Sequence, residues 1–339
     1  MTLCTPSTPF PSRNRIPDPA GVQTIPIPVL VLIPLDPARL AVIQAAGFQT
    51  LVAPTPADRA DGIAGAGDVR AVLTNGAGGL SAAEIAALPK LELICCIGVG
   101  HENVDLAAAK ARGIAVTNGP STNDVTVADH TMALLLAIAR EIPQADAAVR
   151  RGEWLLARHP RPLVFGKKLG ILGLGNIGMQ IASRGANGFG MPVAYHNRSP
   201  RAGCPYTYMA SVLALAEWSD FLVIATPGGR GTVHLVDAAV LAALGPAGYL
   251  INIGRGTVVD TAALIDALAH RRLAGAAVDV VPDEPNVPAG FAELTNLIMT
   301  PHIGGRSPEA MLATASLVAA NLLAHFAGEP VKTPVAMPA

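Results

Sequence analysis

The chain has 339 residues, a formal net charge of −1 at pH 7, and 51% hydrophobic against 14% charged side chains. This length is typical of about two domains, and the apolar content is sufficient for a sizeable core. A balanced charge without a Lys/Arg stripe argues against nucleic acid or an anionic membrane as a partner, and no apolar run approaches the ~20 residues that cross a bilayer.

The N-terminal segment and the cysteines bear on the compartment. Residues 1–26 are rich in Pro, Ser and Thr and lack the apolar stretch of a secretory signal, so we expect a disordered tail or a misassigned start. Cys4, Cys95, Cys96 and Cys204 show no C-x-x-C spacing. We therefore expect neither a disulfide nor a metal site, and a reducing cytoplasm fits free thiols.

Short apolar runs alternate with helical patterns from Pro28 onward. Strands are predicted at 29–33, 49–53, 69–74, 93–97 and 114–117, and helices at 37–46, 81–88 and 103–112. Ser81 and Glu84 have the spacing of a capping box, and Gly113 follows the third helix as its C-cap. Strands that alternate with helices indicate a parallel sheet covered by helices on both faces.

The sequence Asn118-Gly119-Pro120 interrupts this pattern, and we interpret it as a hinge. A long apolar helix follows, capped by Asn123 or Asp124 and ending near Arg140 or Glu141. Because several of its faces are apolar, this helix must be buried by the other domain or by a second subunit.

A second α/β block follows the long helix. Strands are predicted at 169–172, 192–195, 221–225, 249–253, 275–280 and 297–300, with intervening helices at 176–187, 211–216, 237–243 and 261–270. Six strands match the doubly wound nucleotide fold. A last helix, 308–326, is expected to cross back and pack on the first domain.

These patterns predict two doubly wound parallel-sheet α/β domains after the tail of residues 1–26. Residues 27–119 and 306–334 would form a discontinuous, flavodoxin-like substrate domain, and residues 120–305 a Rossmann dinucleotide-binding domain.

A glycine fingerprint, Gly173-Leu174-Gly175-Asn176-Ile177-Gly178, joins the first strand of the second block to its helix. In the dinucleotide fold the first glycine makes the tight turn, the second lets the backbone approach the pyrophosphate, and the third lets helix and strand pack closely. The free N–H groups of the helix then bind the phosphates. The strand before the fingerprint and the helix after it favour a dinucleotide site over an incidental glycine turn.

The residues that follow the next strand indicate which dinucleotide is bound. An acid about twenty residues past the glycines normally binds the adenosine ribose of NAD. Asn197 stands at that place, followed by Arg198, Ser199 and Arg201. Because guanidinium groups bind a 2′-phosphate and a carboxylate would repel it, NADP(H) is preferred and NAD(H) is a weaker alternative. A solvated surface loop is the other interpretation of these arginines.

Three polar residues follow late strands at the sheet edge where ligands bind in open α/β folds. They are Arg255, Glu284 and His302. Each alone has an ordinary explanation, as a salt-bridge partner, a loop acid or a structural histidine. Their arrival at one edge indicates reduction of a 2-oxo acid, with His302 as the proton donor, Glu284 holding its ring, and Arg255 binding the carboxylate and carbonyl. Asp279 is expected to orient the carboxamide of the cofactor.

Together these motifs resemble the NAD(P)-dependent D-2-hydroxyacid dehydrogenase family, over the chain from Pro28 to Pro334. The segments that carry the resemblance are 173–178, 252–256, 279–285 and 300–305. Segments 195–201, 206–208 and 244–246 are similar to the glyoxylate/hydroxypyruvate and hydroxyphenylpyruvate reductase branch, which generally prefers NADPH. The resemblance implies a homodimer joined through the helix from Asp124 to Glu141 and the arm after it, and a cleft that closes between the domains.

The same resemblance implies further contacts. Substrate would meet Val99 and Gly100 through their N–H groups, with Asn75 and Gly76 on a facing loop. The cofactor would contact Thr226, Pro227, Ile253, Gly254, Arg255, Asp279, His302 and Gly304, besides the glycine fingerprint and the loop from Asn197 to Arg201. Residues 228–231 depart from the family pattern, in which a Leu-Thr-Pro-type sequence usually follows this proline. Three of these four residues are glycines, so we expect the loop after Pro227 to be loose.

Alternatives remain open at this point. The substrate could instead be hydroxyphenylpyruvate or 2-ketogluconate, and Trp154 could belong to the partner's pocket or only to the interface packing. A different class of function is a nucleotide-sensing corepressor on the same scaffold. The intact set of Arg255, Glu284 and His302 favours the enzyme.

Overall fold

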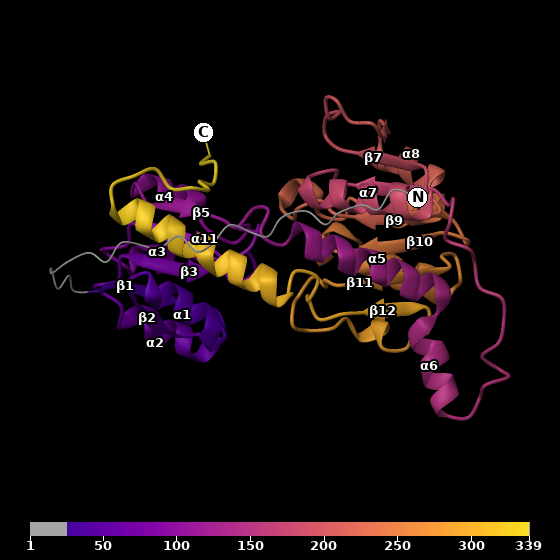
Figure 1. Cartoon of the computed structure of the whole chain (residues 1–339), viewed down its shortest axis with the longest axis horizontal. Helices are drawn as coiled ribbons and strands as arrows, with labels where there is room; N and C mark the ends of the chain where they lie inside the picture. Colours follow the sequence, from indigo (N-terminus) through magenta and orange to yellow (C-terminus); the bar gives the residue numbers. More distant parts are fainter. Residues whose placement is uncertain (1–25, 339) are drawn as a thin grey trace, which may run out of the picture.

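The computed structural model describes residues 26–338. The predicted tail lies outside these residues except for Pro26, and Cys4 lies outside them as well. Figure 1 shows two layered α/β lobes that lie next to each other and are joined by two crossings of the chain.

The first lobe contains a five-stranded sheet in which every pairing is parallel. Its strands are β1 (Ile27–Val31), β2 (Phe48–Val52), β3 (Ala71–Thr74), β4 (Leu93–Cys96) and β5 (Ala115–Thr117), in the order β2-β1-β3-β4-β5. This is the flavodoxin-like order, as predicted. The helices within this part of the chain are α1 (Pro37–Ala45), α2 (Pro56–Ala64), α3 (Ala82–Ala86) and α4 (Leu106–Ala111).

Helix α2 was not predicted. Thr55 caps it by accepting a hydrogen bond from the backbone N–H of Asp58, and Pro56 occupies its first turn. Ile63 is its one buried residue, so the segment lacks the apolar periodicity that marks an amphipathic helix.

Helix α11 (Pro308–Phe326) crosses back to the first lobe, as predicted (Figure 1). Its Val318 and Leu322 are buried in one cluster with Val29 and Val31 of β1. By its length and its mean hydropathy of 1.3, this helix could cross a membrane, although no apolar run in the sequence was expected to be long enough. Its packing on the sheet gives its apolar side chains another explanation.

The second lobe contains a seven-stranded parallel sheet. Its strands are β6 (Leu169–Leu172), β7 (Val193–His196), β8 (Thr207–Tyr208), β9 (Phe221–Ile224), β10 (Tyr249–Asn252), β11 (Gly275–Val278) and β12 (Leu297–Met299), in the order β12-β11-β10-β9-β6-β7-β8. Six of them were predicted. The seventh, β8, has only two residues and therefore gives no periodic signal in the sequence.

Helices cover both faces of this sheet, and each face has its own buried cluster. Helices α8 (Val212–Trp218), α9 (Ala238–Leu244) and α10 (Thr261–Ala269) contribute to one cluster, and α5 (Asp124–Arg140) and α7 (Asn176–Phe189) to the other. Short 3₁₀ turns occur at η1 (Arg230–Thr232), η2 (Gly256–Val258) and η3 (Ala289–Phe291).

The long helix ends at a left-handed residue. Glu141 has φ +51°, and there α5 gives way to α6 (Ile142–Arg150). Helix α6 was not predicted as a separate element. It has no buried residue, and Figure 1 shows it projecting from the second lobe.

Candidate functional site

The glycine fingerprint forms the turn from β6 to α7. Gly173 has φ +99°, and a Cβ at Gly178 would lie 2.4 Å from the carbonyl oxygen of Gly173, so a side chain at Gly178 would force turn and helix apart. At Gly175 the space that a Cβ would take is open. Within the described chain, α7 begins without a side-chain cap, so its first N–H groups remain available. This donor set fits the pyrophosphate of a dinucleotide.

The loop after β7 rests on this turn. The Oδ1 atom of Asn197 accepts a hydrogen bond from the backbone N–H of Leu174 at 2.7 Å, and Nη1 of Arg201 donates to the carbonyl oxygen of Leu174 at 3.1 Å. Arg198 and Ser199 are exposed, and no hydrogen bond or ion pair engages the Arg198 side chain within residues 26–338. The loop thus presents a free guanidinium group beside the glycine turn, which fits a 2′-phosphate.

His302 and Glu284 form a close pair. Glu284 follows β11, His302 follows β12, and the two strands are neighbours in the sheet. Nδ1 of His302 lies 2.7 Å from Oε2 of Glu284, and Oε1 of the same carboxylate accepts a bond from the backbone N–H of Val281. The carboxylate fixes the ring, and Nε2 remains for another partner.

Asp279 anchors the loop that carries His302. It is buried, and its two carboxylate oxygens accept bonds from Thr300 at 2.5 Å and from the backbone N–H groups of Ile303 and Gly304 at 2.9 Å each. Burial raises the pKa of Asp279, but hydrogen bonds from His130, Thr300 and the two backbone N–H groups outweigh it and lower the pKa below its ordinary value. Both oxygens are thus already used within the loop, and the contact with a cofactor carboxamide stays a prediction.

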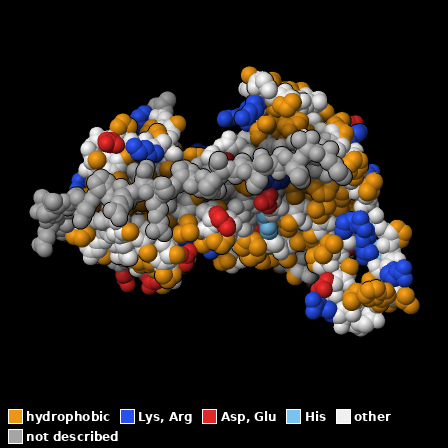
Figure 2. All heavy atoms as spheres, in the orientation of Figure 1, with side chains coloured by type: hydrophobic (Ala, Val, Ile, Leu, Met, Phe, Trp, Pro, Cys, Tyr) orange, Lys and Arg blue, Asp and Glu red, His pale blue; other side chains and the backbone are white. Residues whose placement is uncertain are grey.

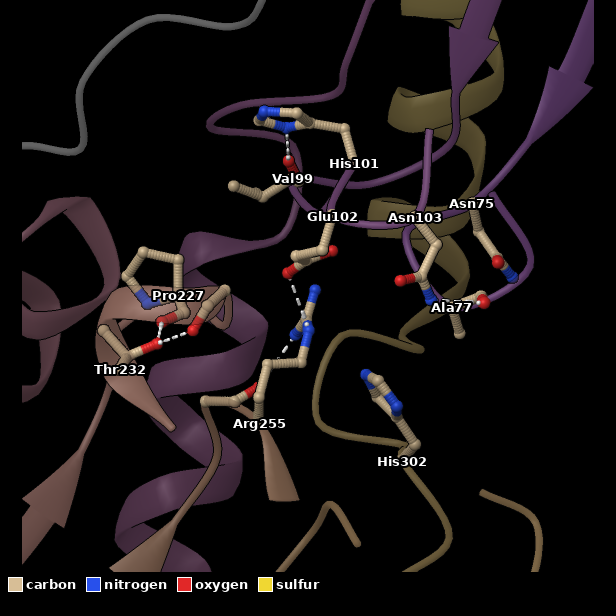
Figure 3. A network of polar contacts seen from close by, with 12 residues as sticks. Asn75, Ala77, Val99, His101, Glu102, Asn103, Pro227, Thr232, Arg255 and His302 are labelled. Carbon is tan, nitrogen blue, oxygen red and sulfur yellow. Dashed lines mark hydrogen bonds and ion pairs between the residues drawn. The ribbon is translucent and has the colours of Figure 1, made fainter. Parts of the chain in front are cut away.

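Arg255 reaches across to the other lobe. It follows β10, and its Nε lies 2.9 Å from Oε1 of Glu102, which comes from the loop after β4 (Figure 3). Nη1 of Arg255 donates to the carbonyl oxygen of Gly254 at 2.8 Å. The Arg255 side chain is 31% exposed and that of Glu102 is 21% exposed, so the pair is largely removed from water.

The loops predicted to hold substrate lie on the first-lobe side of this ion pair. A Cβ at Gly100 would lie 2.1 Å from Nη2 of Arg255. Within residues 26–338 the N–H groups of Val99 and Gly100 donate to no protein acceptor. Oδ1 of Asn75 accepts a bond from the backbone N–H of Gly78, so this side chain also braces its own loop.

The remaining predicted cofactor residues lie at the ends of β9 and β10. The two strand ends are in contact, since a Cβ at Gly254 would lie only 2.5 Å from the carbonyl oxygen of Thr226. Oγ1 of Thr232 donates to the carbonyl oxygens of Pro227 and Gly229, so the glycine-rich loop closes into the turn η1. Ile253 is buried directly before Gly254. The side-chain amide of Asn176 donates a hydrogen bond to Oγ of Ser121, the residue directly after the predicted hinge.

Two residues of this constellation were missed in the sequence. Glu102 lies two positions after Gly100, in the loop that follows the carboxyl end of β4, and this place was the signal that could have identified it. His130, on α5, lies 3.0 Å from Oγ1 of Thr300 and 3.4 Å from Oδ1 of Asp279. In the sequence it is a polar residue within a largely apolar helix, and nothing local connects it to Thr300, which is 170 positions away.

A sizeable cavity lies elsewhere. It measures about 480 Å³ and is lined by Arg70, Pro89, Lys90, Leu91, Glu92 and Arg112. Its cations are already engaged, because Arg70 pairs with Glu92, Lys90 with Asp68, and Arg112 donates to backbone carbonyls. It offers no set of groups comparable to those where the lobes meet.

Comparison with known proteins shows which family the chain resembles. Residues 132–304 match the family model described as D-isomer specific 2-hydroxyacid dehydrogenase, NAD binding domain. The chain is 44% identical to a hydroxyphenylpyruvate reductase of Plectranthus scutellarioides and 43% identical to the glyoxylate/hydroxypyruvate reductase A HPR2 of Arabidopsis thaliana. Each match covers 79% of this chain and 85% of the relative.

A solved structure matches over most of both chains. It is an NADPH-dependent glyoxylate/hydroxypyruvate reductase from Sinorhizobium meliloti in complex with NADP and malonate. The TM-score is 0.85 at 39% identity, over 93% of this chain and 98% of the other.

Proposed function

Because the chain belongs to the D-isomer specific 2-hydroxyacid dehydrogenase family, we propose that it reduces small 2-oxo acids to D-2-hydroxy acids with NADPH. Glyoxylate and hydroxypyruvate are the proposed substrates. The names of the relatives support this substrate class. The free Arg198 side chain beside the glycine turn supports NADPH, with NADH as the weaker alternative.

The observation that carries the proposal is the His302–Glu284 pair at 2.7 Å. Bound NADPH supplies the hydride that adds to C2 of the 2-oxo acid. His302 donates a proton from Nε2 to the carbonyl oxygen as negative charge develops there. Glu284 holds the ring through Nδ1 and stabilises the imidazolium, so the acid is oriented before the reaction begins.

Arg255 and the first-lobe loops bind the substrate. The Nη2 atom of Arg255 is free of protein acceptors within the described residues and lies beside Gly100. It binds the carboxylate and the carbonyl oxygen, and the N–H groups of Val99 and Gly100 complete the carboxylate site. In this arrangement the reacting carbon lies between groups from both lobes, which requires the lobes to be closed during hydride transfer.

A substrate panel tests the function. Consumption of NADPH and NADH is followed by absorbance with glyoxylate, hydroxypyruvate, hydroxyphenylpyruvate and 2-ketogluconate. We expect the two small acids to be reduced with the highest kcat/KM, and with NADPH. A preference for either larger acid would reassign the substrate within the same chemistry. A protein that binds NADPH but reduces none of them would be a nucleotide-sensing binding protein and not an enzyme.

We also propose that the protein is a cytoplasmic homodimer. Exposed apolar side chains line α6 and the segment after it, notably Ile142, Trp154, Leu155, Leu156 and Phe165. Figure 2 shows apolar side chains gathered at the tip of this projection, at the lower right. Such a patch is typical of a surface that another subunit covers. Trp154 fits this interface and could also reach the partner's substrate pocket.

A further inference from the structure

The ion pair between Glu102 and Arg255 uses only half of the Glu102 carboxylate. Oε1 lies 2.9 Å from Nε of Arg255 and forms the ion pair with it. Oε2 is shielded from solvent and has no hydrogen-bond partner among the described residues. Figure 3 shows this second oxygen turned away from the guanidinium group, to the side on which Asn103 and Asn75 lie.

An unpartnered carboxylate oxygen in such a place is costly. A charged oxygen that is removed from water loses its hydrogen bonds to water, and here no donor in the described part of the protein replaces them. A ligand that brings an O–H group to this oxygen removes that cost through a charge-assisted hydrogen bond. The oxygen therefore favours ligands with a hydroxyl group over analogues that lack one.

Glycines place this oxygen at the proposed substrate site. A Cβ at Gly76 would lie 2.4 Å from Oε2 of Glu102, and one at Gly100 would lie 2.7 Å from it. Both glycines belong to the loops proposed to bind substrate, and Gly100 also touches Arg255. The absence of side chains at these two positions is what leaves room for the Glu102 carboxylate against the loops.

We propose that Glu102 is a specificity-determining residue that selects 2-oxo acids with a hydroxyl group on C3. Oε1 positions the guanidinium group of Arg255, and Oε2 accepts the hydrogen bond from the substrate hydroxyl. This rests on the proposed function and narrows its substrate class, because it places hydroxypyruvate above glyoxylate, which has no C3. The carboxylate and the C2 carbonyl of the substrate cannot serve, because both are acceptors.

The test compares three substrates of similar size in steady-state assays with NADPH. Hydroxypyruvate carries the C3 hydroxyl, pyruvate lacks it, and 3-fluoropyruvate is electron-withdrawing at C3 but has no proton to donate. We expect the wild type to favour hydroxypyruvate over both analogues by about 10- to 100-fold in kcat/KM, the range of a hydrogen bond to a charged group. Fluoropyruvate separates this effect from the intrinsic reactivity of the carbonyl.

Two variants remove the acceptor to different degrees. Glu102→Ala should bring the ratio of the kcat/KM values for hydroxypyruvate and fluoropyruvate to within about three-fold of unity, because the hydrogen bond that distinguishes the two substrates is lost. Glu102→Gln keeps an oxygen for Arg255 but removes the charge, so its ratio should fall between those of the wild type and Glu102→Ala. Both variants also lose turnover on every substrate, because Arg255 is less well positioned. The ratio is unaffected by that common loss and by any loss of folded protein.

A matched control removes an ion pair from the same lobe. Glu92→Ala breaks the pair with Arg70, away from the site, and should leave the substrate ratio unchanged. If Glu102→Ala keeps the wild-type ratio, Glu102 does not select the hydroxyl and this inference fails, whereas the proposed function stands. If the wild type reduces glyoxylate but shows no preference for hydroxypyruvate over the two analogues, this inference also fails, and if it reduces neither glyoxylate nor any of the three acids, the proposed function itself fails.

Discussion

His302 has a backbone conformation that histidine seldom adopts, with φ +53°. Its N–H donates to the carbonyl oxygen of Asp279 at 2.9 Å, while the Asp279 carboxylate holds the next two residues of the loop. Buried hydrogen bonds thus support a strained residue, which is the arrangement expected where a side chain must be aimed. The sequence predicted His302 from its place after a strand, but the anchoring by Asp279 depends on contacts that only the folded sheet creates.

Replacing this histidine tests its role as the proton donor. His302→Ala should lower kcat by about 10²- to 10⁴-fold, the usual contribution of a positioned general acid. The Kd for NADPH should change little, because the loop remains held by Asp279. Stopped-flow turnover and fluorescence titration of NADPH measure the two quantities separately. Near-normal turnover would rule out His302 as the proton donor.

Replacing Arg198 tests whether this side chain makes the protein prefer NADPH to NADH. Arg198→Ala should weaken NADPH by about ten-fold or more and leave NADH nearly unchanged, since only NADPH carries the 2′-phosphate. The matched control is Arg271→Ala, which removes an exposed arginine that bonds Thr295 outside the site. Kd values for both nucleotides, measured by calorimetry, decide the matter. An equal loss for the two nucleotides would contradict the assignment.

Single elements show how far local patterns predict structure. Helix α3 and its capping box follow from the spacing of Ser81 and Glu84, and both bonds of the box are present. Helix α2 lacks an apolar stripe, yet its Arg59 donates to Oε1 of Glu84 at 2.5 Å and so ties the two helices together. A capping box can be predicted because its two residues are close in the sequence. The pairing of Arg59 with Glu84 cannot, because Arg59 comes from another helix.

The ion pair between Arg59 and Glu84 makes the stability of the first lobe depend on pH. Burial raises the pKa of Glu84, but hydrogen bonds from Arg59 and Ser81 outweigh it and lower the pKa to about 2 from an ordinary value of 4.5. A depressed folded-state pKa adds stability above pH 4.5, and this stability is lost as pH falls toward 2. Glu84→Gln should therefore cost about 1–2 kcal/mol at neutral pH, less than the full shift implies because the group is partly in water.

Urea unfolding between pH 7 and pH 2 measures this difference. The free energies of unfolding of the wild type and Glu84→Gln should converge as pH falls below 4.5. Glu217→Gln, which changes an exposed acid on α8, should track the wild type throughout. A difference between wild type and Glu84→Gln that stays constant with pH would contradict the proposed ionisation.

The packing of the two lobes brings together residues that are far apart in the sequence. Both sheets are parallel, and their strand order places the carboxyl ends of β4 and β10 where the lobes meet. Alternating strands and helices predict each sheet. The ion pair between Glu102 and Arg255 joins residues 153 positions apart, and it could not be predicted because it depends on how the lobes pack on one another.

The apolar projection leads to a prediction at the scale of the assembly. Leu155 and Leu156 are 79% and 80% exposed, next to Trp154 at 60%, although exposed apolar groups of this size are normally covered. A second copy of the chain would bury them, and large apolar side chains at the centre of an interface carry much of its free energy. Replacing both leucines with glutamate would leave two charges without partners in that interface. The fold should not change, because neither side chain packs on the core.

Light scattering coupled to gel filtration measures the outcome. We expect the wild type to have twice the mass of one chain, and Leu155→Glu combined with Leu156→Glu to have the mass of a single chain with an unchanged circular dichroism spectrum. Leu213→Glu is the matched control, because Leu213 is also exposed but lies on α8, away from the projection, and this variant should remain dimeric. A wild type that is monomeric at micromolar concentration, or a double variant that stays dimeric, would show that the apolar side chains of the projection do not hold two copies together.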